Sequence, residues 1–133
     1  MKVMIVEDDA LAALSVETVL RFCGHQVVGP FASTAEVMRA DHGGRIDLVL
    51  MDINLEGQSS GLDCARVLHK RYGLPVVFIS SDGERARSGR DVALGSMTKP
   101  ISETTMMTGI KAIEQMLRGK TPAHLPAGLE VFH

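Results

Sequence analysis

Carboxylates follow two short apolar runs in this sequence. The run LVLM at 48–51 leads directly into Asp52, and VMIV at 3–6 leads into three consecutive acids, Glu7, Asp8 and Asp9. A short apolar run of this kind is consistent with a buried strand, which would deliver the acids to its own end. Carboxylates that are brought together raise one another's pKa unless a cation lies between them. The pattern therefore predicts a cation site.

Magnesium is the cation that such a cluster favours, because Mg²⁺ takes hard oxygen ligands and keeps several of its waters. Asp8 and Asp52 are the candidates to bind the ion directly. Asn54 lies two residues past Asp52, where its backbone carbonyl could supply a third oxygen. We therefore expect Mg²⁺ as the cofactor.

Asp52 is also a candidate nucleophile. A carboxylate can attack phosphorus and form an aspartyl phosphate, and phosphoryl transfer depends on positioning and on neutralisation of the phosphoryl oxygens. Lys99 could supply an ammonium group for this, and Ser80 a hydroxyl that hydrogen-bonds a phosphoryl oxygen. Ser81 could take the place of Ser80. The candidate catalytic residues are therefore Asp52, Lys99 and Ser80.

These side chains meet only if the strands that carry them are neighbours. The predicted strands are 3–6, 26–29, 46–51, 75–80 and 96–98, and the predicted helices are 10–23, 34–40, 62–71, 83–93 and 102–118. This alternation predicts an α/β fold, a five-stranded doubly wound parallel sheet with helices on both faces. Sites in such sheets lie beyond the carboxyl ends of the strands, where all of the candidates are.

The composition is that of one globular domain. The chain has 133 residues, of which 45% are hydrophobic and 23% charged. We expect a domain over 1–118 and a flexible C-terminal tail over 119–133. A net charge of −2 gives no sign of a nucleic-acid partner, no apolar run is long enough for a membrane span, and the early acids argue against a signal peptide. These features predict a cytoplasmic protein.

Three motifs carry a resemblance to a known family. VMIVEDD, LVLMDIN and TKP, in this order at the ends of the first, third and fifth predicted strands, resemble the motifs of response-regulator receiver domains of bacterial two-component systems. The resemblance covers residues 1 to about 118. It implies a flavodoxin-like fold with strand order 2-1-3-4-5.

The resemblance also implies a role for each candidate. Asp52 would be the phosphoacceptor. Glu7 and Asp8 would be the acid pair that holds Mg²⁺, with Asp8 as the direct ligand and Glu7 acting through water. Ser80 would be the switch hydroxyl and Lys99 the phosphate-binding lysine, and the Lys99–Pro100 bond would be cis.

A receiver of this kind would be a phosphoprotein in a phosphorelay. Its phosphoryl donor would be the phosphohistidine of a sensor histidine kinase or of a histidine phosphotransfer protein. It would modify itself and turn over no separate substrate, so we do not expect an enzyme. We expect a stand-alone receiver that signals to an unknown downstream protein by contact, without an effector domain, and that can form a homodimer through the last helix.

The sequence departs from the family pattern in its second half. The family usually has Tyr or Phe three residues before the lysine, as a rotamer switch, and this chain has Ser96. The stretch from Ser80 to Lys99 is a few residues shorter than usual, which predicts a trimmed fourth helix or following loop, and the loop at 56–61 is longer. The phosphorylation site is therefore predicted to be intact, because its residues match the motifs. The departures predict an altered output face.

Other interpretations stay open. Asp8 and Asp9 could cap a helix. For Arg85, Arg87 and Arg90 we favour a solvated helix face over a phosphate or partner site. The protein could be a scaffold that binds partners without phosphorylation. It could also be a haloacid-dehalogenase-like phosphatase, although such enzymes need an acid at the position of Asn54.

Overall fold

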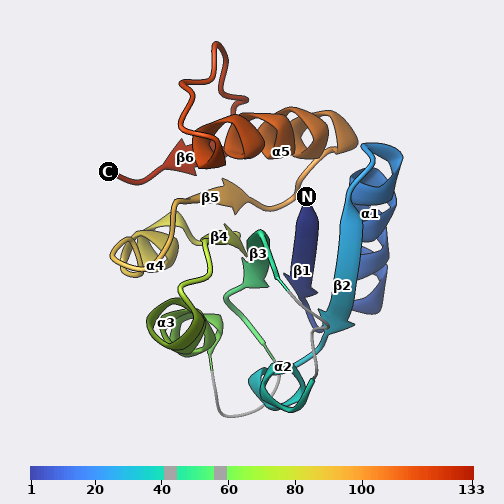
Figure 1. Ribbon diagram of the computed structural model, residues 1–133, viewed down its shortest axis with the longest axis vertical. Coiled ribbons are helices and arrows are strands. Elements are labelled where there is room, and N and C mark those ends of the chain that lie inside the picture. Colours follow the sequence, from blue (N-terminus) through green and yellow to red (C-terminus); the bar gives the residue numbers. More distant parts are fainter. Residues whose placement is uncertain (41–44, 56–59) are drawn as a thin grey trace.

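A single six-stranded sheet forms the centre of the molecule (Figure 1). The computed structural model describes residues 1–40, 45–55 and 60–133. The strands lie in the order β2-β1-β3-β4-β5-β6. Their bounds are β1 Lys2–Val6, β2 Gln26–Phe31, β3 Leu48–Asp52, β4 Val76–Ser80, β5 Gly95–Thr98 and β6 Leu129–Val131. The first five are parallel, which confirms the predicted fold class and strand order.

Helices cover both faces of the sheet, as the alternating pattern predicted. Helices α1 (Ala10–Phe22) and α5 (Glu103–Leu117) lie side by side on one face (Figure 1). The other face carries α2 (Thr34–Arg39), α3 (Gly61–Tyr72) and α4 (Gly83–Arg87). Among the described residues, none of these helices combines the length and apolar character that a bilayer span requires.

Two hydrophobic layers explain why the strand sequences are apolar without interruption. Within β1, Val3 and Ile5 join the layer under α1 and α5, whereas Met4 and Val6 join the layer under α2, α3 and α4. Every residue of β3 and β4 is buried. Since successive side chains point to opposite faces, a strand that is covered on both sides needs apolar residues at every position. The acids can therefore stand only at the strand ends.

The fourth helix is short, as the reduced spacing between Ser80 and Lys99 suggested. The predicted helix at 83–93 is realised only as Gly83–Arg87. Gly89 follows it, and a Cβ atom there would lie 2.7 Å from Phe78 Cε2 and 2.9 Å from Leu62 Cδ2. With a larger residue, either these two side chains or the segment itself would have to shift, so Gly89 lets the trimmed connection pack closely. Residues 56–59 of the predicted longer loop lie outside the described residues.

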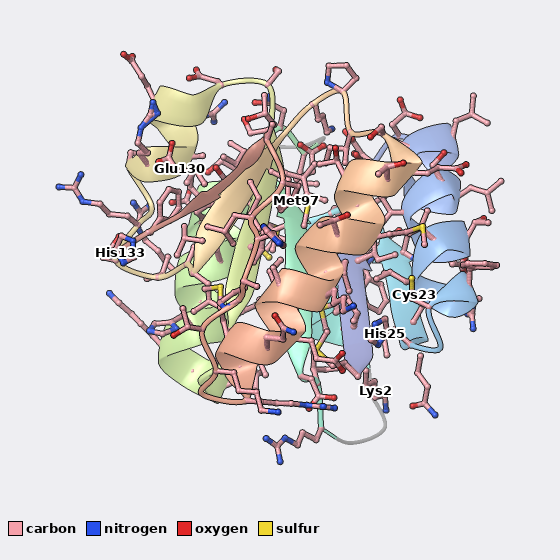
Figure 2. The ribbon with its side chains drawn as sticks, turned by 90° about the horizontal axis from the view of Figure 1, so that it is seen from above. Lys2, Cys23, His25, Met97, Glu130 and His133 are labelled. Carbon is pink, nitrogen blue, oxygen red and sulfur yellow. The ribbon has the colours of Figure 1, made fainter. Side chains whose placement is uncertain are left out.

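The C-terminal segment corrects the sequence prediction. We expected a flexible tail, but Leu129–Val131 forms β6 and pairs antiparallel with β5, so the sheet is mixed and not purely parallel. Beyond the strand pairing, Thr98 N donates to Gly128 O and Phe132 N donates to Leu94 O, both at 2.8 Å. Leu129 is buried beside Met97 in the layer under α5. Figure 2 shows Glu130 and His133 along the side of the sheet near α4.

Gly95 makes the sixth strand possible. A Cβ atom at this position would lie 2.2 Å from Glu130 O, a separation that no side chain can adopt. The β5 backbone therefore accepts β6 only because residue 95 has no side chain.

Gly95→Ala tests this close approach. We expect the substitution to displace β6 and to lower the free energy of unfolding by about 1–3 kcal/mol, as overpacking does. Urea denaturation measures this change, and faster amide exchange at Thr98 would report the lost bond to Gly128. In a chain that ends at Leu125, the same substitution should cost much less. An equal cost in both chains would contradict the role of Gly95 in seating β6.

Candidate functional site

The carboxyl ends of four neighbouring parallel strands converge on one crevice. Pairing places Val6 beside Met51, Asp52 beside Ile79, and Ser80 beside Thr98. The residues that end or follow these strands are the predicted site residues, Glu7, Asp8, Asp52, Ser80 and Lys99. The register therefore brings together residues that lie up to 92 positions apart in the sequence.

Three acids form a group that fits a hard cation. Glu7, Asp8 and Asp52 can each offer one carboxylate oxygen such that the three atoms lie within 4.8 Å of one another. Asp52 is 3% exposed and Glu7 is 7% exposed, while Asp8 is half-buried. An all-oxygen set open on one side suits Mg²⁺, which binds through one or two carboxylates and keeps waters. Position and donor type thus agree with the predicted magnesium ligands.

Lys99 lies between two of these acids. Its Nζ is 2.9 Å from Glu7 Oε1 and 3.5 Å from Asp52 Oδ1. The lysine side chain is 32% exposed, so the ammonium can face the crevice as well as the two carboxylates. The bond before Pro100 is cis, as the family resemblance implied.

Burial and the closeness of the carboxylates set the ionisation of this group. Burial is the largest effect that raises the pKa of Glu7, and hydrogen bonding and repulsion from Asp52 raise the pKa further. Lys99 and the Asp9 amide oppose the rise without cancelling it. For Lys99, burial is the largest single effect and lowers the pKa, but Glu7 and Asp52 together outweigh it, so the pKa of Lys99 is raised. One lysine therefore does not fully compensate the acids.

The Asp52 carboxylate is held by the loop that follows it. Asn54 N donates to Asp52 Oδ1 at 3.1 Å, and Lys99 Nζ lies 3.5 Å from the same oxygen. The bond keeps the side chain directed into the crevice. That the Asn54 carbonyl is a metal ligand stays a prediction.

Ser80 is buried and is engaged away from the acids. Its Oγ accepts from Asp82 N at 2.9 Å and lies 3.2 Å from Asp82 O, to which it donates. Ser81 is exposed. Ser80 stands at the predicted strand end, but its hydroxyl proton would have to turn away from Asp82 O before it could be donated to a phosphoryl group on Asp52.

The helix-cap interpretation holds for one acid of the triplet. Asp9 accepts from Leu11 N and Ala12 N and is the N-cap of α1. Asp9 N also donates to Glu7 Oε2 at 3.3 Å. Asp8, in contrast, belongs to the group of three acids that can share an ion. Within the triplet, Asp9 therefore caps α1, while Glu7 and Asp8 belong to the acid group of the site.

Arg85 makes a contact in this region that the sequence analysis missed. It was assigned to a solvated helix face, but Arg85 Nη1 donates to Asn54 Oδ1 at 2.6 Å. The only sequence signal is its position three residues after Asp82, the N-cap of α4. The contact joins residues 31 apart, so it depends on how α4 is placed on the sheet.

Two hollows lie at the ends of the sheet. One of about 440 Å³ opens beside the acids between α1 and α5, and its lining includes Glu7, Asp9, Lys99 and Ser102. A larger one of about 830 Å³ lies at the amino ends of β1, β3 and β4 and contains none of the predicted site residues. The smaller hollow therefore borders the site at Glu7 and Lys99.

Comparison with known proteins decides the family. The family model for the response regulator receiver domain matches residues 3–118. The chain belongs to the response regulator receiver family. This places the protein in two-component signalling and confirms the predicted resemblance.

Individual relatives cover the receiver to different extents. The phyllosphere-induced regulator PhyR of Methylorubrum extorquens is 36% identical over 89 residues, which are 66% of this chain and 33% of the relative. The transcriptional regulatory protein PdtaR of Mycobacterium tuberculosis is 26% identical over 113 residues, covering 83% of this chain and 55% of the relative. The chain thus spans between about a third and just over half of these relatives.

Solved structures agree in fold. A signal receiver domain of a modulated diguanylate cyclase from Desulfovibrio desulfuricans G20 is 32% identical, with a TM-score of 0.75 over 89% of this chain and 94% of that chain. The response regulator PhyR from Brucella abortus is 31% identical, with a TM-score of 0.70 over 80% of this chain and 44% of that chain. The receiver fold therefore extends over nearly all of the present chain.

Glu7→Gln tests the charge balance of the site. Because the pKa of Glu7 is raised in the fold, its contribution to stability is present below the unfolded value of about 4.5 and is lost as pH rises through the folded pKa. Without divalent ions, Glu7→Gln should therefore be more stable than the wild type at pH 7, and this advantage should fade toward pH 4. Denaturant titration at both pH values measures it.

Magnesium should make the wild type more stable than Glu7→Gln at pH 7. At a concentration one hundred times the dissociation constant, Mg²⁺ would stabilise the wild type by about 2.7 kcal/mol, and Glu7→Gln should gain less. The exposed Glu84→Gln serves as a control that responds to neither condition. A loss of stability in Glu7→Gln at pH 7 without metal would mean that the Lys99 ion pair outweighs burial, contrary to this account.

Proposed function

We propose that this receiver takes a phosphoryl group from a phosphohistidine onto Asp52 in a Mg²⁺-dependent reaction. One observation carries the proposal: a buried carboxylate, an acid pair and a lysine meet at one open crevice, with Lys99 Nζ 2.9 Å from Glu7 and 3.5 Å from Asp52. Phosphoryl transfer needs these parts, because catalysis rests on positioning and on neutralising the phosphoryl oxygens.

The transfer would proceed at named atoms. A carboxylate oxygen of Asp52 attacks phosphorus as the bond to the imidazole nitrogen breaks, and the imidazole keeps the electron pair and takes a proton from solvent. Asn54 N holds Asp52 in place through Oδ1, and Lys99 offsets charge on the phosphoryl oxygens. Bound Mg²⁺ would supply the remaining neutralisation, held by Asp8 and Asp52 directly and by Glu7 through water. Asp52 itself carries the transferred group, so the domain has no separate turnover substrate.

The added charge, about −1.5 to −2 for a phosphoryl group, would then change the surroundings of Asp52. Ser80 would leave Asp82 and donate to a phosphoryl oxygen. Because Asp82 caps α4, this exchange would alter the start of that helix. The change would be read by a downstream protein through contact, in the cytoplasm, where ATP-dependent kinases supply the phosphohistidine.

The surroundings of Ser96 on β5 favour a response to phosphorylation that differs from an aromatic rotamer switch. Ser96 is buried and lies opposite Glu130 of β6. Residues Met106, Ile110 and Ile113 of α5 are buried in the core. For the proposed homodimer contact, this leaves the exposed Met107 and the partly buried Met116 and Leu117 as apolar residues of the helix. We therefore expect α4 and β6 to carry more of the signal than α5.

Intact mass measurement tests the chemistry. Incubation with Mg²⁺ and acetyl phosphate should add one phosphoryl group to the wild type, and Asp52→Asn should remain unmodified because an amide is not a nucleophile at phosphorus. Chelation of Mg²⁺ should slow labelling by at least about tenfold, in line with the role of the metal in phosphoryl transfer.

The same assay separates the rival functions. A phosphatase would release phosphate from small esters over many turnovers, whereas a receiver takes one group per chain. A scaffold that works without phosphorylation would show no label in the wild type. Either of these results would contradict the proposed function.

A further inference from the structure

Arg85 brings a second cation to the edge of the phosphorylation site. Its Nη1 donates to Asn54 Oδ1 at 2.6 Å, and Asn54 N donates to Asp52 Oδ1 at 3.1 Å. The guanidinium therefore bonds the side chain of the residue whose backbone amide holds the predicted phosphoacceptor. It comes from α4, whereas Lys99 follows β5, so the two cations reach Asp52 from different elements.

The partner of Arg85 is a neutral amide. Its neighbour on the same helix, Arg87, pairs with Glu130 at 3.5 Å, but within the described part of the chain no carboxylate lies at ion-pair distance from the Arg85 guanidinium. A guanidinium has five donors, and the bond to Asn54 uses one. Within the described residues, the other four donors and the positive charge therefore have no carboxylate partner.

Arg85 is held in this place by the same turn that engages Ser80. Arg85 N donates to Asp82 Oδ1 at 3.1 Å, and Asp82 N donates to Ser80 Oγ at 2.9 Å. Hydrogen bonds thus run from Ser80 through Asp82 and Arg85 to Asn54 and back to Asp52. A change in the bonding of Ser80 would therefore act on Asp82, the residue that also bonds Arg85 N.

From these contacts we propose that Arg85 binds the phosphoryl group on Asp52, as a second side-chain cation beside Lys99. A doubly charged phosphoryl group is a stronger acceptor than the Asn54 amide, and a guanidinium matches its geometry with two parallel donors. The contact would draw the start of α4 toward the crevice. The inference rests on the proposed function, because it needs Asp52 to be the acceptor.

The test uses beryllofluoride, which binds an aspartate carboxylate and mimics its phosphoryl group. Binding to the full chain is measured by calorimetry with Mg²⁺ in excess, for the wild type, Arg85→Gln and Arg87→Gln. Glutamine can still hydrogen-bond Asn54 but carries no charge. Because Arg85 is exposed, we expect Arg85→Gln to weaken binding by up to about fivefold, the range of exposed charge pairs. Arg87→Gln, a matched change two residues away, should stay close to the wild type.

Salt separates a charge effect from a structural one. Near about 0.5 M salt, screening should shrink the difference between Arg85→Gln and the wild type, whereas a disturbed α4 would weaken binding equally at low and high salt. Equal binding by Arg85→Gln and the wild type, or a salt-independent loss, would overturn the role of Arg85 alone. A wild type that binds no beryllofluoride would instead overturn the proposed function.

Discussion

The sharing of one ammonium group between two buried carboxylates is the constraint on which the rest of the structure depends. Lys99 lies 2.9 Å from Glu7 and 3.5 Å from Asp52, and the pKa of Glu7 remains raised in spite of it. Carboxylates in such surroundings are stable only with compensating charge. The parallel sheet supplies the geometry for that compensation, because β1, β3 and β5 must all end at the same edge. The resulting shortage of positive charge is also what makes the crevice receptive to a metal ion.

The second half of the chain keeps this geometry while changing what surrounds it. Gly89 lets a shortened α4 connection pack against Phe78, and Gly95 lets β6 approach β5. Glu130 then pairs with Arg87 of α4 at 3.5 Å. The short helix α4 contacts the site through Arg85 and the added strand β6 through Arg87. It therefore links the site to the C-terminal segment, two regions for which the sequence predicted no contact. Ser96 is buried on β5 and lies opposite the same Glu130.

Much of the fold and most of the site could be predicted from the sequence for a simple physical reason. A strand buried on both faces must be apolar throughout, so its polar end stands out, as at Asp52 and Glu7. Which of Asp8 and Asp9 caps α1 and which joins the acid group could not be predicted, because both are suitable as caps and as ligands. Arg85 and β6 were missed since each depends on contacts between distant segments. Leu129–Val131 has only three residues, too few for a period to be recognised.

The Mg²⁺ affinity of Lys99→Met tests the central claim most directly. If Lys99 and the metal compete to neutralise the same acids, removing the ammonium while keeping an apolar stem should tighten Mg²⁺ binding by about tenfold, or about 1.4 kcal/mol. Calorimetric titration measures this, with the exposed Lys111→Met as the matched control. Weaker or unchanged binding in Lys99→Met would show that the lysine does not balance the charge of Glu7 and Asp52, and would contradict the account.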